Sequence, residues 1–433
     1  MKNFTSLGLN PALLEAIQKK GYTTPTPVQA GSIPPALEGR DIFALAQTGT
    51  GKTAAFAIPI LNNLYANGTP NELRVLVLAP TRELAIQIDA SFKVYGSVLK
   101  PRMALIYGGV SQKPQEDALR NRPVIVTATP GRLLDLYGQG RIKLDKVDIL
   151  VLDECDRMLD MGFANDLRKI VALLPQKRQT LLLSATMPSE IREMTKKYLN
   201  NPVTVEIPSE HVSPVLIEQR CYHVDRENKV DLMMSILKSE NIDQALVFTR
   251  TKRGADRLAK VMANKGISAG SFHGDKSQNQ RERCLNDFRK GNIRLLIATD
   301  VASRGIDIKE LPAVFNYDMP ADSETYVHRI GRTGRAGMEG HAISFRTYED
   351  KDIERDIIRQ QGQSMRIITQ HEFLPTGLLT DPGPKPERSG RGRTGGNRFA
   401  GSKSQSSGSS RGNGYSRNES GNSSAPKRTA ARW

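Results

Sequence analysis

The sequence is poor in cysteine, with three residues, Cys155, Cys221 and Cys284, in a chain of 433. They lie far apart without paired spacing, so they indicate neither a disulfide framework nor a zinc site, and we interpret them as reduced thiols. The chain also lacks any apolar run long enough to span a membrane, and residues 1–10 lack the apolar core of a signal peptide. These absences predict a soluble, cytoplasmic protein that does not act in a membrane.

Acidic residues are too few to balance the basic ones, which leaves a formal net charge of +16. Residues 376–433 contain eleven basic and three acidic residues, so half of this excess lies in that segment. Aliphatic residues are almost absent from it. Such a segment cannot bury enough surface to fold alone, so we expect a disordered Gly/Ser/Arg-rich basic tail. Its arginines, with Phe399, Tyr415 and Trp433, offer charge and stacking groups suited to RNA, although a purely solubilising tail is the alternative. A basic surface would equally suit an anionic membrane.

In the rest of the chain, short apolar runs alternate with helix-length amphipathic stretches, the pattern of βαβ units in a parallel sheet. One series occupies residues 30–207 and a second occupies residues 218–375, with weak periodicity between them. We therefore predict two α/β domains joined by a linker at residues 208–217. The apolar runs are 41–45, 74–79, 104–107, 124–127, 147–152, 180–184 and 203–207 in the first series, and 245–249, 267–272, 294–299, 313–317 and 341–345 in the second.

Residues 46–53 (AQTGTGKT) follow the first apolar run and lead into a helix-compatible stretch. Glycine-rich turns in this context wrap backbone N–H groups around phosphate at a helix N-terminus. Lys52 would then reach the terminal phosphates, and Thr53 would bind Mg²⁺. The strict pattern has glycine at the first position, where this chain has Ala46, and such a turn on its own is often only a turn.

Residues 147–154 (VDILVLDE) supply the second half of a nucleoside-triphosphate site. The apolar residues predict a buried strand whose end directs Asp153 toward the metal, with Glu154 beside it to orient or deprotonate a water. An acidic pair after an apolar run is often only a solvated strand end. Both segments together, each in the expected strand context, predict ATP hydrolysis.

Further short segments follow in order: PTRELA at 80–85, GG at 108–109, TPGR at 129–132, SAT at 184–186, TDVASRGID at 299–307 and HRIGRTGR at 328–335. Over roughly residues 2–375, this series resembles the motifs of the DEAD-box RNA helicases. Residues 21–29 (GYTTPTPVQ), with Phe4 upstream, are similar to the family's adenine-recognising Q motif, so residues 1–29 form a Q-motif region. The short N-terminal segment, Tyr107 with the glycine pair, and the compact basic tail resemble the bacterial RhlE-like subgroup.

The resemblance implies two tandem RecA-like domains with a site for ATP and Mg²⁺. Gln29 would bind the adenine edge, Phe4 would stack near the base, and Asp307 would contact the ribose. Arg332 and Arg335 would act as arginine fingers on the transferred phosphoryl group, although arginines on a basic face often bind phosphate backbones instead. The implied nucleotide contacts are Phe4, Tyr22, Gln29, Gln47, Thr48, Gly49, Thr50, Gly51, Lys52, Thr53 and Asp307. The implied metal ligands are Thr53 and Asp153. The implied catalytic residues are Glu154, Asp153, Lys52, Arg332 and Arg335.

The resemblance also implies that RNA crosses both domains and is held mainly by its sugar-phosphate backbone. Recognition would then be largely independent of sequence, and 2′-hydroxyl contacts would select RNA over DNA. Ser184, Thr186 and His328 would couple hydrolysis to RNA binding, although a histidine beside a strand end is more often simply hydrogen-bonded in place. The implied RNA contacts, several of which would serve equally as strand-end caps, are Arg82, Gly109, Thr129, Arg132, Thr249, Arg250, Gln278, Arg281, Thr299 and Arg304.

The family's four-residue signature reads DECD at 153–156 in this chain, with Cys155 where alanine is usual. Cysteine is small and weakly polar, so it can occupy a buried alanine-sized site with modest repacking. We hypothesise that its thiol makes the enzyme sensitive to oxidation.

We therefore predict an ATP-dependent RNA helicase in which ATP and RNA together close the two domains, unwinding short duplexes and remodelling RNA–protein complexes. Its partners would be single-stranded RNA and short duplexes, in assemblies such as ribosomal precursors or RNA-decay complexes. An ATP-gated RNA clamp or annealing chaperone is the alternative function. A DNA helicase of the same superfamily is disfavoured by residues 21–29.

Overall fold

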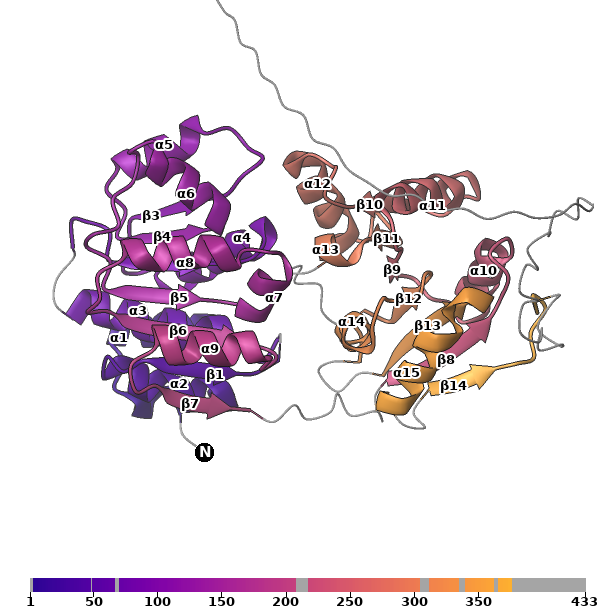
Figure 1. The fold of residues 1–433 in the computed structure, drawn as a ribbon, viewed down its shortest axis with the longest axis horizontal. Coiled ribbons are helices and arrows are strands. Elements are labelled where there is room, and N and C mark those ends of the chain that lie inside the picture. The colour runs from indigo at the N-terminus through magenta and orange to yellow at the C-terminus, as the bar shows by residue number, and fades with distance from the viewer. Residues whose placement is uncertain are drawn as a thin grey trace, which may run out of the picture. The chain divides into compact units, whose positions relative to one another are not determined.

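The computed structural model describes residues 3–47, 49–66, 70–207, 217–303, 311–334, 339–361 and 365–375. They form two α/β lobes, each built on a seven-stranded parallel sheet covered by helices (Figure 1). We call residues 3–207 lobe 1 and residues 217–375 lobe 2. The predicted fold class is confirmed, whereas all of the predicted tail and nearly all of the predicted linker lie outside the described residues.

The sheet of lobe 1 has the strand order β3-β4-β2-β5-β6-β1-β7. Its strands are β1 (Ile42–Leu45), β2 (Val75–Leu78), β3 (Met103–Ile106), β4 (Ile125–Ala128), β5 (Ile149–Leu152), β6 (Gln179–Ser184) and β7 (Val203–Glu206). Its helices are the 3₁₀ turn η1 (Phe4–Leu7), α1 (Pro11–Lys19), α2 (Pro27–Leu37), α3 (Lys52–Ala66), α4 (Arg82–Tyr95), α5 (Lys113–Arg120), α6 (Pro130–Gly138), α7 (Cys155–Asp160), α8 (Ala164–Leu173) and α9 (Ser189–Tyr198).

The strand residues of lobe 1 alternate between two hydrophobic cores, one on each face of the sheet. Val75 and Val77 belong to the core shared with α1–α4, whereas Leu76 and Leu78 belong to the core shared with α6–α9. Because both faces are buried, the strands appear in the sequence as continuous apolar runs. This explains why the predicted runs match strands of the structure to within two residues at either end.

The sheet of lobe 2 has the strand order β10-β11-β9-β12-β13-β8-β14. Its strands are β8 (Ile217–His223), β9 (Ala245–Phe248), β10 (Ala269–Phe272), β11 (Leu295–Ala298), β12 (Ala313–Asn316), β13 (Gly340–Arg346) and β14 (Met365–Ile368). Its helices are α10 (Lys229–Ser239), α11 (Lys252–Asn264), α12 (Gln278–Arg289), α13 (Asp300–Ser303), α14 (Ser323–Ile330), the 3₁₀ turn η2 (Tyr348–Asp350) and α15 (Lys351–Gln361).

Two strands of lobe 2, β8 and β14, are absent from the sequence prediction. Strand β8 reads IEQRCYH, in which charged and polar residues interrupt the apolar ones, and β14 has only four residues. The two strands pair with each other, and β8 also pairs with β13, so they complete the sheet on one side. Hydrophobic periodicity alone does not distinguish a strand as polar as β8 from a loop.

All strand pairs in both sheets are parallel, so the carboxyl ends of neighbouring strands meet at one edge of each sheet. In folds of this kind, ligand-binding loops collect at that edge. Most of the segments singled out by the sequence follow strands at this edge: β1 to β6 in lobe 1, and β9 and β11 in lobe 2. Residues 328–335 instead begin in the last turn of α14. Among the helices in the described residues, none combines the length and apolarity needed to cross a bilayer.

Candidate active site

The loop after β1 has the backbone geometry of a phosphate-binding loop. Gly49 and Gly51 have φ angles of 89° and 94°, conformations that residues with a Cβ rarely adopt. Lys52 begins α3, and its buried ammonium group donates to the carbonyl oxygen of Ala46 at 2.8 Å. The lysine therefore reaches back across its own loop, next to the free N–H groups at the start of α3.

Gln29, on α2, ties the Q-motif region to this loop. Its amide oxygen accepts the N–H of Thr26 at 3.0 Å, and its amide nitrogen donates to the carbonyl oxygen of Gly51 at 3.2 Å. A Cβ on Gly51 would collide with this amide. Gln29, Gly51 and Lys52 line one pocket, so the residue predicted to read adenine is held against the loop predicted to hold phosphate.

The two aromatic residues predicted near the base have different surroundings. Tyr22 is 39% exposed, lines the same pocket and lies against Tyr95 of α4, with ring centroids 6.4 Å apart. Phe4 is 3% exposed and belongs to the hydrophobic core that α1–α4 share with the sheet. Direct stacking of Phe4 on a base therefore does not fit the structure, because its ring is already enclosed by apolar side chains.

Asp153 and Glu154 follow β5 and are almost completely buried, with exposures of 2% and 3%. Asp153 Oδ1 accepts the N–H of Glu154 at 3.0 Å. Burial raises the pKa of Asp153, and the nearby ammonium of Lys52 opposes that rise. Both carboxyl groups line the same pocket as Thr53, so the pocket contains the hydroxyl and carboxylate oxygens that Mg²⁺ prefers in proteins. These residues fit the predicted metal.

Asp156 links this turn to the loop after β6. Its Oδ2 accepts the N–H groups of Ala185 and Thr186 at 3.0 and 2.9 Å and the hydroxyl of Thr186 at 3.1 Å. Burial alone would raise the pKa of Asp156, but the charge of Lys52 and backbone N–H donors lower it overall. The hydroxyl of Ser184 donates to the carbonyl oxygen of Thr186 at 2.7 Å. The predicted coupling segment is thus bonded to the acidic segment.

Two of the positions predicted to contact RNA in lobe 1 lie together. The guanidinium of Arg82, at the start of α4, approaches Gly109 so closely that a Cβ there would collide with it. Gly109 also has a φ of 79°, so glycine is required for both space and backbone conformation. Thr129 is buried at the start of α6, and Arg132 donates to Oε1 of Gln112 at 3.0 Å.

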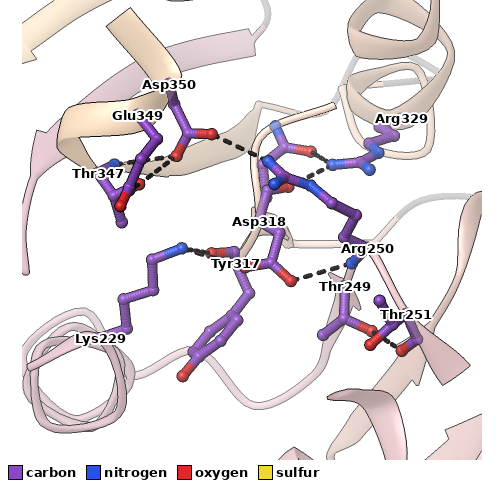
Figure 2. Close-up of polar contacts among 11 residues, drawn as sticks. Lys229, Thr249, Arg250, Thr251, Tyr317, Asp318, Arg329, Thr347, Glu349 and Asp350 are labelled. Atoms are coloured by element: carbon purple, nitrogen blue, oxygen red, sulfur yellow. Dashed lines mark hydrogen bonds and ion pairs between the residues drawn. The ribbon is translucent and has the colours of Figure 1, made fainter. Parts of the chain in front are cut away.

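In lobe 2, polar side chains from the ends of β9, β12 and β13 form one network (Figure 2). The backbone N–H of Arg250 donates to Asp318 Oδ2, and its guanidinium donates to Asp350 Oδ1, both at 2.9 Å. Asp350 also accepts the N–H and hydroxyl of Thr347 at 3.1 and 2.7 Å. The carboxylate of Asp350 is therefore fixed in place, while the side chain of Arg250 stays 60% exposed.

A buried lysine completes this network from α10. Lys229, the first residue of that helix, donates to the carbonyl oxygen of Tyr317 at 2.6 Å and to Asp318 Oδ1 at 3.2 Å (Figure 2). Burial lowers the pKa of Lys229, and the charge of Asp318 opposes that effect. Thr249, the neighbouring predicted contact, is also buried, and its hydroxyl donates to the carbonyl oxygen of Thr251 at 3.4 Å.

The remaining predicted positions of lobe 2 lie apart from this network. Gln278 and Arg281 occupy the first turn of α12. Thr299 is buried after β11, His328 is half-buried in the last turn of α14, and Arg332 follows that helix. Four predicted residues lie outside the described part of the chain: Thr48, Arg304, Asp307 and Arg335.

Several side chains that hold these loops are not predicted from the sequence. Arg329 binds both carboxylate oxygens of Asp300, at 2.6 and 2.8 Å, and donates to the carbonyl oxygen of Asp318 at 2.7 Å. Arg157 forms an ion pair with Glu154 at 2.6 Å. The available signal for Arg329 is its place inside residues 328–335, and for Asp318 it is its place directly after an apolar run.

Cys155 is fully buried in lobe 1, and its Sγ lies 3.9 Å from Sδ of Met194. Burial raises the pKa of this thiol, so very little of the reactive thiolate is present at neutral pH. Its packing agrees with the expectation that cysteine can replace a small buried residue. Its burial and protonation argue against the hypothesis of an oxidation-sensitive thiol.

Comparisons with known proteins find matches for both lobes. The DEAD/DEAH box helicase model matches residues 26–194, and the helicase conserved C-terminal domain model matches residues 228–337. The chain is 43% identical over 354 residues to the DEAD-box ATP-dependent RNA helicase RhpA of Helicobacter pylori (strain B128), covering 82% of this chain and 71% of RhpA. It is 43% identical over 378 residues to the DEAD-box ATP-dependent RNA helicase CshA of Geobacillus kaustophilus, covering 86% of this chain and 80% of CshA.

A similar solved structure is that of S. cerevisiae Dbp5 bound to RNA and ADP BeF3. Its TM-score is 0.77 at 33% sequence identity, and the match covers 85% of this chain and 96% of Dbp5. The likeness therefore extends over both lobes, as the sequence resemblance implies.

Proposed function

This chain belongs to the DEAD-box family of ATP-dependent RNA helicases, and we propose which of its residues carry out each step of that activity. The observation that carries the proposal is the pocket of lobe 1, where Gln29, Lys52, Asp153 and Glu154 come together. A lysine and two buried carboxylates beside a glycine-rich loop are suited to holding a nucleoside triphosphate and hydrolysing it.

In lobe 1, Gln29 reads the adenine edge and Tyr22 contacts the base. The phosphates lie against the loop of residues 47–51 (QTGTG) and the ammonium of Lys52. Thr53 and Asp153 hold Mg²⁺, which neutralises charge on the phosphate oxygens when it is bound. Glu154 orients the attacking water and accepts its proton. Thr48 and Thr50 belong to the same loop, and their assignment rests on the sequence pattern.

Three further residues act on the nucleotide from lobe 2. We assign Arg332 and Arg335 as arginine fingers, since charge that develops on the transferred phosphoryl group needs cations beyond Lys52. Asp307 contacts the ribose. All three roles rest on the family resemblance, and those of the two arginines rest also on the chemical need for cations.

RNA binds along the strand-end loops of both lobes through its backbone. In lobe 1, Arg82 offers its guanidinium beside Gly109, where the absence of a side chain leaves room for that guanidinium. In lobe 2, Arg250 remains exposed while Asp318 and Asp350 fix its position. The other RNA contacts are proposed at Thr129, Arg132, Thr249, Gln278, Arg281, Thr299 and Arg304.

Binding of ATP and RNA favours a closed arrangement of the lobes in which one RNA strand is bent and a short duplex is parted. Hydrolysis removes the γ-phosphate contacts that favoured closure, and the RNA is released. The hydrogen bonds from Ala185 and Thr186 to Asp156 give a direct physical link between the hydrolytic residues and the loop after β6. Ser184, Thr186 and His328 are the proposed coupling residues.

Three narrower assignments complete the proposal. Tyr107 with its glycine pair and the basic composition of residues 376–433 favour the RhlE-like subgroup, although the relatives compared above are named RhpA and CshA. We place the protein in the cytoplasm, where RNA and ATP are both available. Ribosomal precursors and RNA-decay complexes are the proposed assemblies.

The test is an ATPase assay with single-stranded RNA or matched DNA, alongside displacement of a short RNA duplex. We expect RNA but not DNA to stimulate turnover, and duplex displacement to require ATP. Glu154→Gln should abolish turnover and retain RNA, and neutralising Arg332 and Arg335 together should lower kcat about 1,000-fold. RNA retention without displacement would favour the clamp alternative, and undiminished turnover in Glu154→Gln would contradict the assignment of the base.

A further inference from the structure

Glu154 has a backbone conformation that is unusual for its residue type. Its φ and ψ angles are 51° and 53°, in the left-handed region, at the turn between β5 and α7. A residue with a Cβ is strained in this region, so it persists there only where its surroundings hold it in place. The contacts that hold Glu154 therefore matter for where its carboxylate lies.

One side chain supplies such a contact. Nη1 of Arg157 lies 2.6 Å from Oε2 of Glu154, and the two side chains are 5% and 3% exposed. In the part of the chain that the structure describes, no other side chain is seen to bond this carboxylate, so Oε1 is left for a different ligand. A buried ion pair such as this one has a strongly preferred geometry, because separating its partners leaves two buried charges without compensation.

Arg157 is itself carried by a well-anchored turn. Its backbone N–H donates to Asp156 Oδ1 at 2.9 Å, and Asp156 Oδ2 is bonded to the loop after β6 through Ala185 and Thr186. The N–H of Met158 donates to the carbonyl oxygen of Glu154 at 3.1 Å. The guanidinium thus projects from a rigid support, one helical turn beyond the carboxylate that it binds.

We propose that Arg157 is the positioning residue of the general base: it holds Oε2 of Glu154 so that Oε1 faces the water that attacks the γ-phosphate. This inference rests on the role proposed above for Glu154. Arg157 binds the carboxylate of Glu154 and is not among the described residues that line the pocket, so we assign it to the alignment of the base alone. Its removal should slow the chemical step and leave ATP binding unchanged.

The experiment compares Arg157→Met, Arg157→Lys and Glu154→Gln in the full chain, with RNA-stimulated ATPase measured over a range of ATP concentrations. We expect Arg157→Met to lower kcat about 10- to 100-fold with KM for ATP within about twofold of wild type. Arg157→Lys keeps the charge and should recover part of the loss. In the Glu154→Gln background, Arg157→Met should cause no further loss, since both changes disable the same group.

A matched control lies at the other end of the same strand. Arg74 donates through Nε to Asp148 Oδ2 at 2.8 Å, and Asp148 immediately precedes β5, whereas Glu154 follows it. Arg74→Met therefore removes an arginine–carboxylate pair from the same strand without touching the pocket. Its kcat should equal that of wild type, and thermal unfolding of both methionine variants separates loss of stability from loss of chemistry.

Several outcomes would overturn the inference. They are an unchanged or increased kcat in Arg157→Met, a loss confined to KM, or a loss that adds fully to that of Glu154→Gln. If Arg157→Met does not fold, Arg157→Gln carries the same expectation. Full turnover in Glu154→Gln would instead refute the proposed base itself. Loss in Glu154→Gln with normal turnover in Arg157→Met would refute only the positioning role.

Discussion

The two lobes share one topology but differ at the edge where ligands bind. Counted from the first strand of each sheet, both strand orders read 3-4-2-5-6-1-7. In lobe 1, the loop after the first strand is glycine-rich and its lysine begins the next helix. In lobe 2, the corresponding residues 224–229 (VDRENK) contain no glycine, although Lys229 likewise begins the next helix.

The lysine and the aspartate at equivalent places have opposite surroundings in the two lobes. Lys52 bonds to its own loop, and Asp153, at the end of the fifth strand, lines a pocket with it. Lys229 instead bonds directly to Asp318, near the end of the fifth strand of lobe 2 (Figure 2). In lobe 1 the lysine and the aspartate remain available to a ligand, whereas in lobe 2 they form an ion pair with each other. The comparison teaches that fold position alone does not make a nucleotide site.

Replacing each lysine by methionine tests this comparison most strongly. Lys52→Met should lower kcat/KM for ATP more than about 100-fold, because it removes a cation aimed at the phosphates. Lys229→Met should leave ATP turnover at saturating RNA within a few-fold of wild type. It should instead cost about 3 kcal/mol of unfolding free energy, near the lower end for breaking a buried pair, since Asp318 is 30% exposed.

ATPase kinetics and urea unfolding of both variants provide the measurement. Asp318→Leu combined with Lys229→Met should recover part of the lost stability, because no buried charge is then left alone. Loss of turnover in Lys229→Met as severe as in Lys52→Met would refute the interpretation of lobe 2 as a closed, structural version of the site.

Much of lobe 1 is predictable from the sequence because its determinants are local. The phosphate loop, the strand before it and the acidic pair each lie within a few consecutive residues, and buried parallel strands appear as apolar runs. The pair of Lys229 and Asp318 is not predictable in this way, since 89 residues separate the partners and neither lies in a recognisable segment. For Phe4, the family motif predicts a place near the base but does not reveal that the hydrophobic core encloses its ring.

The glycine-rich phosphate loop is present in lobe 1 and has no counterpart in lobe 2, so it offers a second test with a smaller expected effect. Gly51→Ala should raise KM for ATP about tenfold, because a Cβ at φ 94° is strained and would displace the Gln29 amide. Gly39→Ala is the matched control, since Gly39 has a φ of 76° but open space around it. It should lose about 1 kcal/mol of stability with an unchanged KM. Equal KM values in both alanine variants would show that crowding at Gln29 is unimportant.

The arginines after the second strand of each sheet offer a test on the RNA side. Arg82→Gln and Arg250→Gln should each weaken RNA binding about 3- to 10-fold and reduce its salt dependence by about one ion. Asp350→Asn should weaken binding only about twofold, because it loosens the guanidinium of Arg250 without removing it. The double variant with Arg250→Gln and Asp350→Asn should have the same RNA affinity as Arg250→Gln alone. Titrations at several salt concentrations provide the measurement, and tighter binding by Asp350→Asn would mean that the carboxylate competes with RNA.

The smallest expected effect concerns a fully buried cysteine, Cys155, and a partly exposed one, Cys284. Burial raises the pKa of the Cys155 thiol far above neutral, and it raises the pKa of the half-exposed Cys284 thiol to about 11. Because only the thiolate reacts readily, alkylation of the folded protein should label Cys284 first and leave Cys155 unmodified until unfolding. Cys155→Ala should lose about 1 kcal/mol of stability and no ATPase activity. Mild peroxide should leave the ATPase of wild type and Cys155→Ala equally intact, and a loss confined to wild type would restore the hypothesis of an oxidation-sensitive thiol beside the active site.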